Sequence, residues 1–378
     1  MSVWKSIEIN KLTLHNRWIR SATWEAMATP KGGATRELVA WYDTLAQGGL
    51  GLIIASHAFV TENGRVKDVQ LSLANDKIAA EHKKIVDASH IHGSAIMAQL
   101  THGGYASITD SPKTICSLPD DLTLRATVKM PIEAEEYTIE ELEALEDAFA
   151  AAAARCKRIA GYDGVQFHAG HGYLISTTLS PAVNRRPDRY GKDRALFLRN
   201  IVAKARALVG PDFPLAVKIN GSDYFDIDGR PVGSTVQTTI DALSSIPGLD
   251  AVEVSGGVKY GAYQAIRKGN FFPLDKQGYH RNETKAIRDA LAPLGVTVIA
   301  VGGIRTPSGA DRLIDSGVCD AVAMCRPFIA EPHIVKLMMQ NHDLTRVKCV
   351  SCSRCIEAMS SPGVIVACQQ CMRDQMKT

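Results

Sequence analysis

Eight short apolar runs, rich in β-branched residues, recur along the chain with room for a helix after each one. They cover residues 19–23, 49–56, 94–100, 164–169, 214–220, 251–256, 296–302 and 321–325. Runs that are apolar throughout are typical of parallel strands buried on both faces. Eight strands that alternate with helices predict an α/β fold in which the sheet closes into a (β/α)8 TIM barrel. The alternative is an open doubly wound sheet, but no GxGxxG follows the first run.

The composition changes once, after Gln340, where the alternation stops and a cysteine-rich segment begins. The total of 378 residues suits one barrel with additions, because a barrel of this kind needs about 250 residues. Within it, Thr138 and Glu141 have the spacing of a capping box and predict a helix start. We therefore divide the chain into a barrel domain, residues 1–340, and a cysteine-rich extension, residues 341–378.

Charge and hydropathy exclude several classes of function. A net charge of +3 gives no basic field for nucleic acid. The N-terminus lacks the charged start and apolar run of a signal peptide, and the longest alanine-rich stretch, residues 148–154, is too short to span a membrane. We expect a cytoplasmic protein that acts on a small molecule. In that compartment clustered cysteines bind metal more often than they form disulfides.

The seventh and eighth runs end in residues suited to a phosphate. Gly302 and Gly303 let backbone N–H groups approach a ligand closely. Thr306 and Pro307 predict the start of a helix, which favours an anion, and Arg326 adds a forked cation. In a barrel, phosphates commonly bind at this place. The alternative is a tight turn followed by an ordinary capped helix.

The fourth run ends in candidate catalytic residues, His168, His171 and Tyr173. Two imidazoles three residues apart can donate to one carbonyl or nitro oxygen, and a nearby phenol can supply a proton. A zinc site and packed loop histidines are the alternatives. Lys218 ends the fifth run and would stabilise a cofactor that becomes anionic on reduction, while Gln99 suits the edge of a heterocycle.

The cysteine-rich segment has the spacing of a metal site. Two, two and twelve residues separate Cys349, Cys352, Cys355 and Cys368. A tight trio with one distant ligand favours an iron–sulfur cluster. Zinc remains open, because Cys349 with Cys352 and Cys368 with Cys371 would form two C-x-x-C pairs.

Together these motifs resemble the old yellow enzyme family of FMN-dependent NADH:flavin oxidoreductases. The resemblance covers residues 1–340, through INKLTLHNR (9–17), FHAGHGYLISTTLSPAVNRRPDRYG (167–191), VGGI (301–304) and CRP (325–327). It implies a barrel preceded by a β-hairpin. It also implies bound FMN that is reduced by transiently bound NAD(P)H and passes hydride to the β carbon of an activated alkene, such as an enone or enoyl-CoA.

The resemblance also assigns roles to individual residues. His168 and His171 would hold the substrate carbonyl, and Tyr173 would protonate the α carbon. Contacts to FMN are implied for Ser21, Ala22, Thr23, Trp24, Gln99, Lys218, Gly302, Gly303, Cys325 and Arg326. Arg267 lies in a long segment that should overhang the mouth as a lid or substrate wall, and we take it as a substrate-binding candidate.

Three positions depart from the family pattern. Lys218 stands where many members have arginine, so its contact would be a point charge. Cys325 replaces a commoner glycine. Trp24 replaces a threonine or cysteine that touches the flavin, and its indole would either narrow the substrate space or point into the core.

The extension resembles the segment after the barrel in 2,4-dienoyl-CoA reductase and trimethylamine dehydrogenase, which carries a 4Fe-4S cluster. That implies Cys349, Cys352, Cys355 and Cys368 as ligands, with Cys371 as a spare thiol or substitute ligand. A ferredoxin or separate flavoprotein would then be an external electron partner, and a homo-oligomer is expected. An amine dehydrogenase or demethylase, or an FMN/Fe-S electron-transfer protein, is the alternative function.

Overall fold

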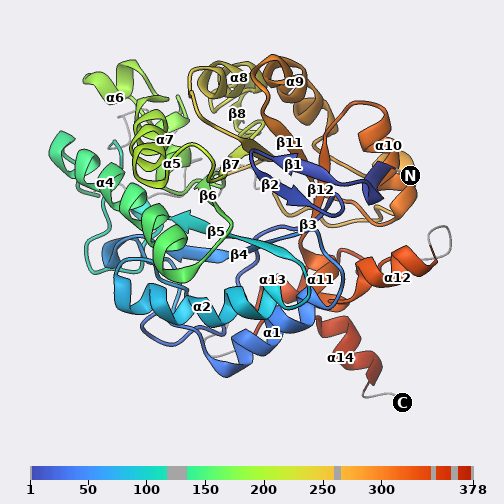
Figure 1. Ribbon diagram of the computed structural model, residues 1–378. Helices are drawn as coiled ribbons and strands as arrows, with labels where there is room; N and C mark the ends of the chain where they lie inside the picture. The colour runs from blue at the N-terminus through green and yellow to red at the C-terminus, as the bar shows by residue number, and fades with distance from the viewer. Residues whose placement is uncertain (1, 117–133, 259–264, 342–345, 359–364, 376–378) are drawn as a thin grey trace.

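The computed structural model describes residues 2–116, 134–258, 265–341, 346–358 and 365–375. Eight parallel strands form a closed barrel in which the last strand pairs with the first (Figure 1). They are β3 (Trp18–Arg20), β4 (Leu52–Phe59), β5 (Ala95–Thr101), β6 (Gly164–Ala169), β7 (Leu215–Asn220), β10 (Ala251–Ser255), β11 (Thr297–Val301) and β12 (Ala321–Met324). Each coincides with one of the eight apolar runs, so the predicted (β/α)8 barrel is confirmed.

Helices surround this barrel and cover the outward faces of its strands (Figure 1). The longer ones are α1 (Arg36–Ala46), α2 (Asp76–His90), α4 (Ile139–Arg155), α7 (Leu196–Val209), α8 (Val236–Ser244), α9 (Arg281–Leu291) and α10 (Pro307–Asp315). The shorter ones are α5 (Leu174–Leu179), α6 (Arg189–Lys192), α11 (Arg326–Ala330), α12 (Ile334–Gln340), α13 (Arg354–Ala358) and α14 (Gln369–Gln375). The predicted capping box of Thr138 and Glu141 starts α4, and Thr306 caps α10 with Pro307 as its first residue. Among the residues that the structure describes, no helix has the length and apolar character needed to cross a bilayer.

The N-terminal hairpin closes one end of the barrel. Its strands β1 (Ile7–Ile9) and β2 (Leu12–Leu14) are antiparallel, as predicted. Ile9 and Leu14 share a buried apolar cluster with Ile19, Leu52 and Ala251, which lie on barrel strands near their beginnings. The hairpin therefore covers the N-terminal end and leaves the C-terminal end, where barrel enzymes bind ligands, open.

The barrel interior changes from apolar to polar along its axis. Successive residues of a strand alternate between faces, so a step of two stays on the inward side. One such step leads from Met97 to Gln99 on β5, and another leads from Ala251 to Glu253 on β10. An apolar lower layer thus supports a polar upper layer at the mouth.

The segment after residue 345 lies against the loops at that mouth. The backbone N–H of Val347 donates to the carbonyl of Arg305 at 3.2 Å, and that of Val366 donates to Glu25 at 3.1 Å. These two bonds join the cysteine-rich segment to loops that follow β11 and β3.

A further two-stranded ribbon, β8 (Asp226–Ile227) and β9 (Arg230–Pro231), follows β7.

Candidate active site

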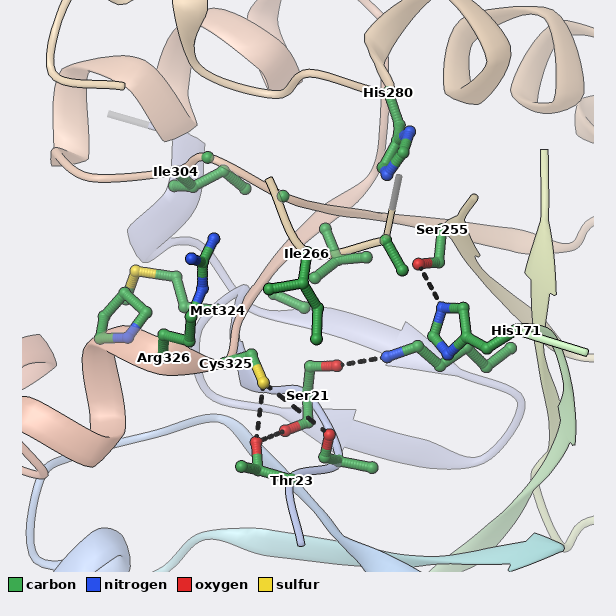
Figure 2. A pocket seen from close by; sticks show the side chains of 18 of the residues that line it. Ser21, Thr23, His171, Ser255, Ile266, His280, Ile304, Met324, Cys325 and Arg326 are labelled. Carbon is green, nitrogen blue, oxygen red and sulfur yellow. Dashed lines mark hydrogen bonds between the residues drawn. The ribbon is translucent and has the colours of Figure 1, made fainter. Parts of the chain in front are cut away.

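One cavity of about 1100 Å³ opens at the C-terminal ends of the strands. All of the predicted catalytic and cofactor-binding residues line it: Ser21, Ala22, Thr23, Trp24, Gln99, His168, His171, Tyr173, Lys218, Gly302, Gly303, Cys325 and Arg326. Figure 2 shows Ser21, Thr23, His171, Cys325 and Arg326 around this space, together with His280. Residues far apart in the sequence thus meet at the place where a barrel presents its chemistry.

The predicted histidine pair and tyrosine form one group. The ring centroids of His168 and His171 are 5.2 Å apart, and those of His168 and Tyr173 are 5.1 Å apart. His171 has a left-handed φ of 64°, and the Oδ1 of Asn220 accepts its backbone N–H at 3.1 Å. Its Nε2 lies 2.8 Å from the Oγ of Ser255, as Figure 2 shows. A strained backbone held by two partners indicates a fixed ring orientation.

A buried ion pair forms part of the cavity floor. The Nζ of Lys218 donates to Glu253 Oε1 at 2.9 Å and to the Oγ of Ser21 at 2.7 Å. Gln166 donates to the other oxygen of Glu253 at 2.9 Å and accepts from Gln99 Nε2 at 2.7 Å. The cation predicted at Lys218 is therefore paired and orientated within the protein.

The predicted phosphate end combines two glycines with two buried arginines. Gly302 and Gly303 have φ angles of 117° and 75°, and a Cβ on Gly302 would come within 2.5 Å of the Tyr279 ring. Arg305 and Arg326 both line the cavity, with 3% and 8% of their surfaces exposed. The glycines are required both for backbone conformation and for space.

The capped start of α10 offers an anion fewer free backbone N–H groups than the sequence predicts. Gln277 Oε1 accepts the backbone N–H groups of Arg305 at 2.8 Å and Thr306 at 3.3 Å. These two amides are already used within the protein. Cationic side chains, and not the helix start, are the main feature that an anion would meet here.

Neither of these arginines has a carboxylate partner within the described residues. Arg305 donates to the carbonyl of Ile304 and to the Oγ of Ser351, and its Nε is buried without a partner. Arg326 donates to Ser353 Oγ and to the carbonyl of Arg267. Burial lowers the pKa of the Arg305 guanidinium. The two positive charges thus favour an anionic ligand.

Trp24 is among the residues that line the cavity, and Lys67 Nζ lies 5.4 Å from the centroid of its ring. This position favours the interpretation in which the indole narrows the substrate space. Cys325 Sγ lies 2.9 Å from the Oγ1 of Thr23 (Figure 2). The three departures from the family pattern, Trp24, Lys218 and Cys325, all line the cavity.

Arg267 lies beside the cavity, whereas its neighbours Ala265 and Ile266 line it. Its guanidinium stacks over the rings of Tyr279 at 4.7 Å and Tyr224 at 5.4 Å. It therefore supports the cavity wall from behind in this structure.

Five further residues of the site were not predicted from the sequence. His57, Ser255, Tyr279, His280 and Arg305 also line the cavity. Burial, followed by the nearby positive charges, lowers the pKa of His280 to about 3, so its ring is neutral at physiological pH. Its Nδ1 lies 3.0 Å from the hydroxyl of Tyr224, and its Nε2 is buried without a partner in the described part of the chain. An unpaired imidazole nitrogen at a cavity wall suits a hydrogen bond to a ligand.

A smaller cavity of about 350 Å³ lies beside the first. Its lining includes Cys349, Cys352, Cys355 and Cys368, and Arg326 borders both cavities. The Cys371 thiol lies outside this lining, 3.9 Å from the carbonyl of Ala330. In the described ranges, no three His, Cys, Asp or Glu side chains are close enough together to form a site for one metal ion.

A family model matches residues 2–344 and describes the NADH:flavin oxidoreductase / NADH oxidase family. The chain belongs to this family. Its members bind FMN and use NAD(P)H as donor. The predicted family resemblance is confirmed.

Proteins of this family include relatives that are longer than the chain. A metal reductase of Desulforamulus reducens is 31% identical over 92% of the chain and 50% of that protein. An N,N-dimethylglycine/sarcosine dehydrogenase of Chromohalobacter salexigens is 30% identical over 98% of the chain and 52% of that protein. The chain therefore spans about half the length of these curated relatives. A solved 2-naphthoyl-CoA reductase matches with a TM-score of 0.85 at 22% identity, over 97% of the chain and 56% of that chain, which supports the fold.

Proposed function

We propose that the chain is an FMN-dependent ene-reductase, an NAD(P)H oxidoreductase that acts on an alkene conjugated to a carbonyl or similar group. The observation that carries this proposal is the group of His168, His171 and Tyr173 at one cavity wall, with ring centroids 5.2 and 5.1 Å apart. Imidazole N–H donors aimed at one oxygen polarise a conjugated system, and a phenol nearby can complete the addition of hydrogen. Enones, enoyl-CoA thioesters and nitroalkenes are the substrate classes that need these groups.

The remaining lining of the cavity fits FMN. Two buried arginines that have no carboxylate partner among the described residues suit its phosphate, and the glycines at 302 and 303 leave room that a Cβ would fill. Lys218 would stabilise negative charge on the cofactor, with Glu253 fixing its position. Bound FMN would supply two-electron chemistry, taking hydride from NAD(P)H and giving it to the β carbon of the alkene.

The protein's own groups would complete the reaction. His168 and His171 would hold the carbonyl oxygen and stabilise the charge that develops on it during the addition. Tyr173 would give its phenolic proton to the α carbon, and a solvent proton would then restore it. Ile266 and Trp24 would limit the volume open to substrate. Arg267 would contribute to substrate binding through this wall, because its guanidinium packs over the rings of Tyr279 and Tyr224.

We further propose that the extension, residues 341–378, holds a 4Fe-4S cluster on Cys349, Cys352, Cys355 and Cys368. Four thiols around a common cavity suit a cluster, because each thiolate binds a different iron. Cys371 would be the spare thiol, since it lies outside that lining. The cluster would exchange single electrons with an external partner, a ferredoxin or a separate flavoprotein, and the protein would act in the cytoplasm as a homo-oligomer.

The test is anaerobic purification followed by flavin, iron and sulfide analysis, and then a screen of enones, enoyl-CoA thioesters and nitroalkenes. We expect one FMN, and substrate reduction that falls about 100- to 1,000-fold in the variant His168→Ala/His171→Ala, the usual cost of removing such donors. Reduction of the flavin by NAD(P)H should remain in this variant. Protein that cannot be loaded with FMN, or a double variant with unchanged alkene reduction, would refute the proposal.

A second candidate is oxidation of an amine, which the relative named N,N-dimethylglycine/sarcosine dehydrogenase favours. In that case the oxidised protein would take electrons from small tertiary or secondary amines. Anaerobic stopped-flow separates the candidates. An ene-reductase shows flavin reoxidation by alkenes, and an amine dehydrogenase shows flavin reduction by amines. A protein that does neither while exchanging electrons with a redox partner would be an electron-transfer protein.

A further inference from the structure

Two serines of the cysteine-rich segment contact the two buried arginines of the active-site cavity. Ser351 Oγ accepts a hydrogen bond from Arg305 Nη2 at 2.6 Å, and Ser353 Oγ accepts one from Arg326 Nη1 at 2.9 Å. All four residues are buried. Both serines lie between proposed cluster ligands, on either side of Cys352. The segment that would bind the cluster therefore also holds the cations that would bind the cofactor.

The backbone at these serines is unusual. Ser351 and Ser353 have left-handed φ angles of 61° and 63°, where glycine is the ordinary choice. A residue with a side chain persists in this conformation when surrounding contacts hold it there. The hydroxyl groups are the parts of these side chains that make such contacts.

Arg326 also lies between two places suited to negative charge, and Arg305 faces one of them. Arg326 lines both the active-site cavity and the cysteine-lined cavity, and Arg305 lines the active-site cavity. Within the described residues neither has a carboxylate partner, so their bonds to protein are to hydroxyl and carbonyl oxygens. A phosphate in the first cavity would stabilise both cations, and a thiolate-bound cluster in the second would stabilise Arg326 from its other side.

We propose that Ser351 and Ser353 are positioning residues that couple the two sites, so that a filled cysteine site strengthens binding of FMN and bound FMN protects the cluster. This rests on the proposed function, which supplies both groups. A cluster fixes the loop that carries the serines, and the serines then hold the arginines where a phosphate meets them. Since coupling between binding sites is reciprocal, each group strengthens the other by the same factor.

The test compares FMN binding to protein loaded with the cluster and to the same protein stripped of iron by a chelator. Quenching of FMN fluorescence gives the dissociation constant in each state. We expect FMN to bind about 100-fold more weakly to the stripped protein, about tenfold for each hydrogen bond to a charged group. Reconstitution with iron and sulfide should restore affinity. The reciprocal readout is the rate of iron loss to the chelator, which FMN should slow.

Variants separate the hydroxyl groups from the backbone strain. Ser351→Ala/Ser353→Ala should bind FMN with the weaker affinity in both states. Ser351→Gly/Ser353→Gly relieves the left-handed strain and should be uncoupled to the same extent. Ser245→Ala is the matched control, because it removes a serine–arginine hydrogen bond far from both cavities, between Ser245 just after α8 and Arg199 on α7 at 3.1 Å. It should keep the wild-type coupling.

The outcomes distinguish this inference from the proposed function. Wild-type protein that loads FMN and cluster but binds FMN equally in both states would overturn the coupling alone. So would glycine variants that retain the wild-type coupling factor, because the hydroxyl groups would then be unnecessary. Protein that takes up neither FMN nor iron would refute the proposed function itself.

Discussion

The two sides of the active-site cavity differ in whether a carboxylate of the protein pairs with their buried cations. On one side, Lys218 is paired with Glu253 at 2.9 Å, and further hydrogen bonds satisfy that carboxylate. On the other side, Arg305 and Arg326 contact hydroxyl and carbonyl oxygens, with no carboxylate partner in the described part of the chain. Both sides exclude water to a similar degree. The two sides therefore differ in the source of the counter-charge, which is Glu253 for Lys218 and would be a bound anion for the arginines.

This difference suggests a division of labour. A cation neutralised by the protein has the same position before and after ligand binding, which suits a group that stabilises charge during a reaction. A cation that lacks a protein counter-charge gains most when an anionic ligand arrives. We therefore propose that the Lys218 side is preorganised for chemistry and that the arginine side binds the anionic part of a ligand.

The largest expected effect on the unfolding free energy comes from removing the carboxylate that pairs with Lys218. Glu253→Leu leaves Lys218 buried without a counter-charge, which costs about 3–5 kcal/mol of unfolding free energy. Urea unfolding of the apoprotein measures it. Glu253→Leu/Lys218→Met removes both charges and should recover most of the loss. A loss below about 1 kcal/mol in the single variant would mean that Lys218 does not depend on its partner.

Removing a cation on the arginine side of the cavity should weaken FMN binding and leave the stability of the apoprotein nearly unchanged. Arg305→Met removes a buried cation with an unpartnered Nε, so we expect the unfolding free energy of the apoprotein to change by less than about 1 kcal/mol. The stabilisation that FMN adds should fall by about 2 kcal/mol, as a hydrogen bond to a charged group is lost. Thermal unfolding with and without FMN measures both quantities. A large loss in the apoprotein would contradict the comparison.

A smaller effect appears as a dependence on pH. The pKa of buried His280 is about 3 in the folded protein and near 6.5 when unfolded, so below pH 6.5 the unfolded state binds more protons. The contribution of His280 is complete above pH 6.5 and is lost as the pH falls toward 3. Relative to pH 8, the loss at pH 5.5 is about 1.4 kcal/mol.

His280→Phe should remove this part of the pH dependence. Other buried histidines, His82 and His102, have pKa values lowered by burial in the same direction and remain in the variant. The comparison of variant and wild type at pH 8 and 5.5, by urea unfolding, therefore isolates His280. Equal changes in the two proteins would show that the ring is protonated or accessible in the folded state.

The barrel and the predicted site residues followed from the sequence for a physical reason. Strands buried on both faces leave continuous apolar runs, and a barrel presents the ends of those runs at one mouth. His168 and Lys218 lie in the second half of such a run and Arg326 directly follows one, so the sequence predicts that they meet at the mouth.

The site residues that were not predicted lie away from the ends of the apolar runs, where the sequence gives no such indication. Glu253 lies in the middle of β10, directly beside Lys218 on the neighbouring strand β7, and the sequence does not show the register that pairs these two residues. The one signal in the sequence was an acid within an otherwise apolar run, AVEVSG. His280 comes from a loop far from its own strand, and the serine contacts of Arg305 and Arg326 depend on how the cysteine-rich segment folds back. Contacts between distant segments such as these leave no repeating pattern in the sequence from which they could be predicted.

The smallest expected effect tests whether burial, and not the ion pair itself, sets how much the loss of one partner lowers the unfolding free energy. Lys285 and Asp289 on α9 have the same 2.9 Å separation as Lys218 and Glu253, but about half of each side chain is exposed. Lys285→Ala should cost only about 0.3–0.5 kcal/mol in urea unfolding, because solvent screens the charges and one turn of helix holds them. A cost close to that of Glu253→Leu would mean that distance alone sets the strength of these pairs, and the contrast between the two sides of the cavity would then lose its physical basis.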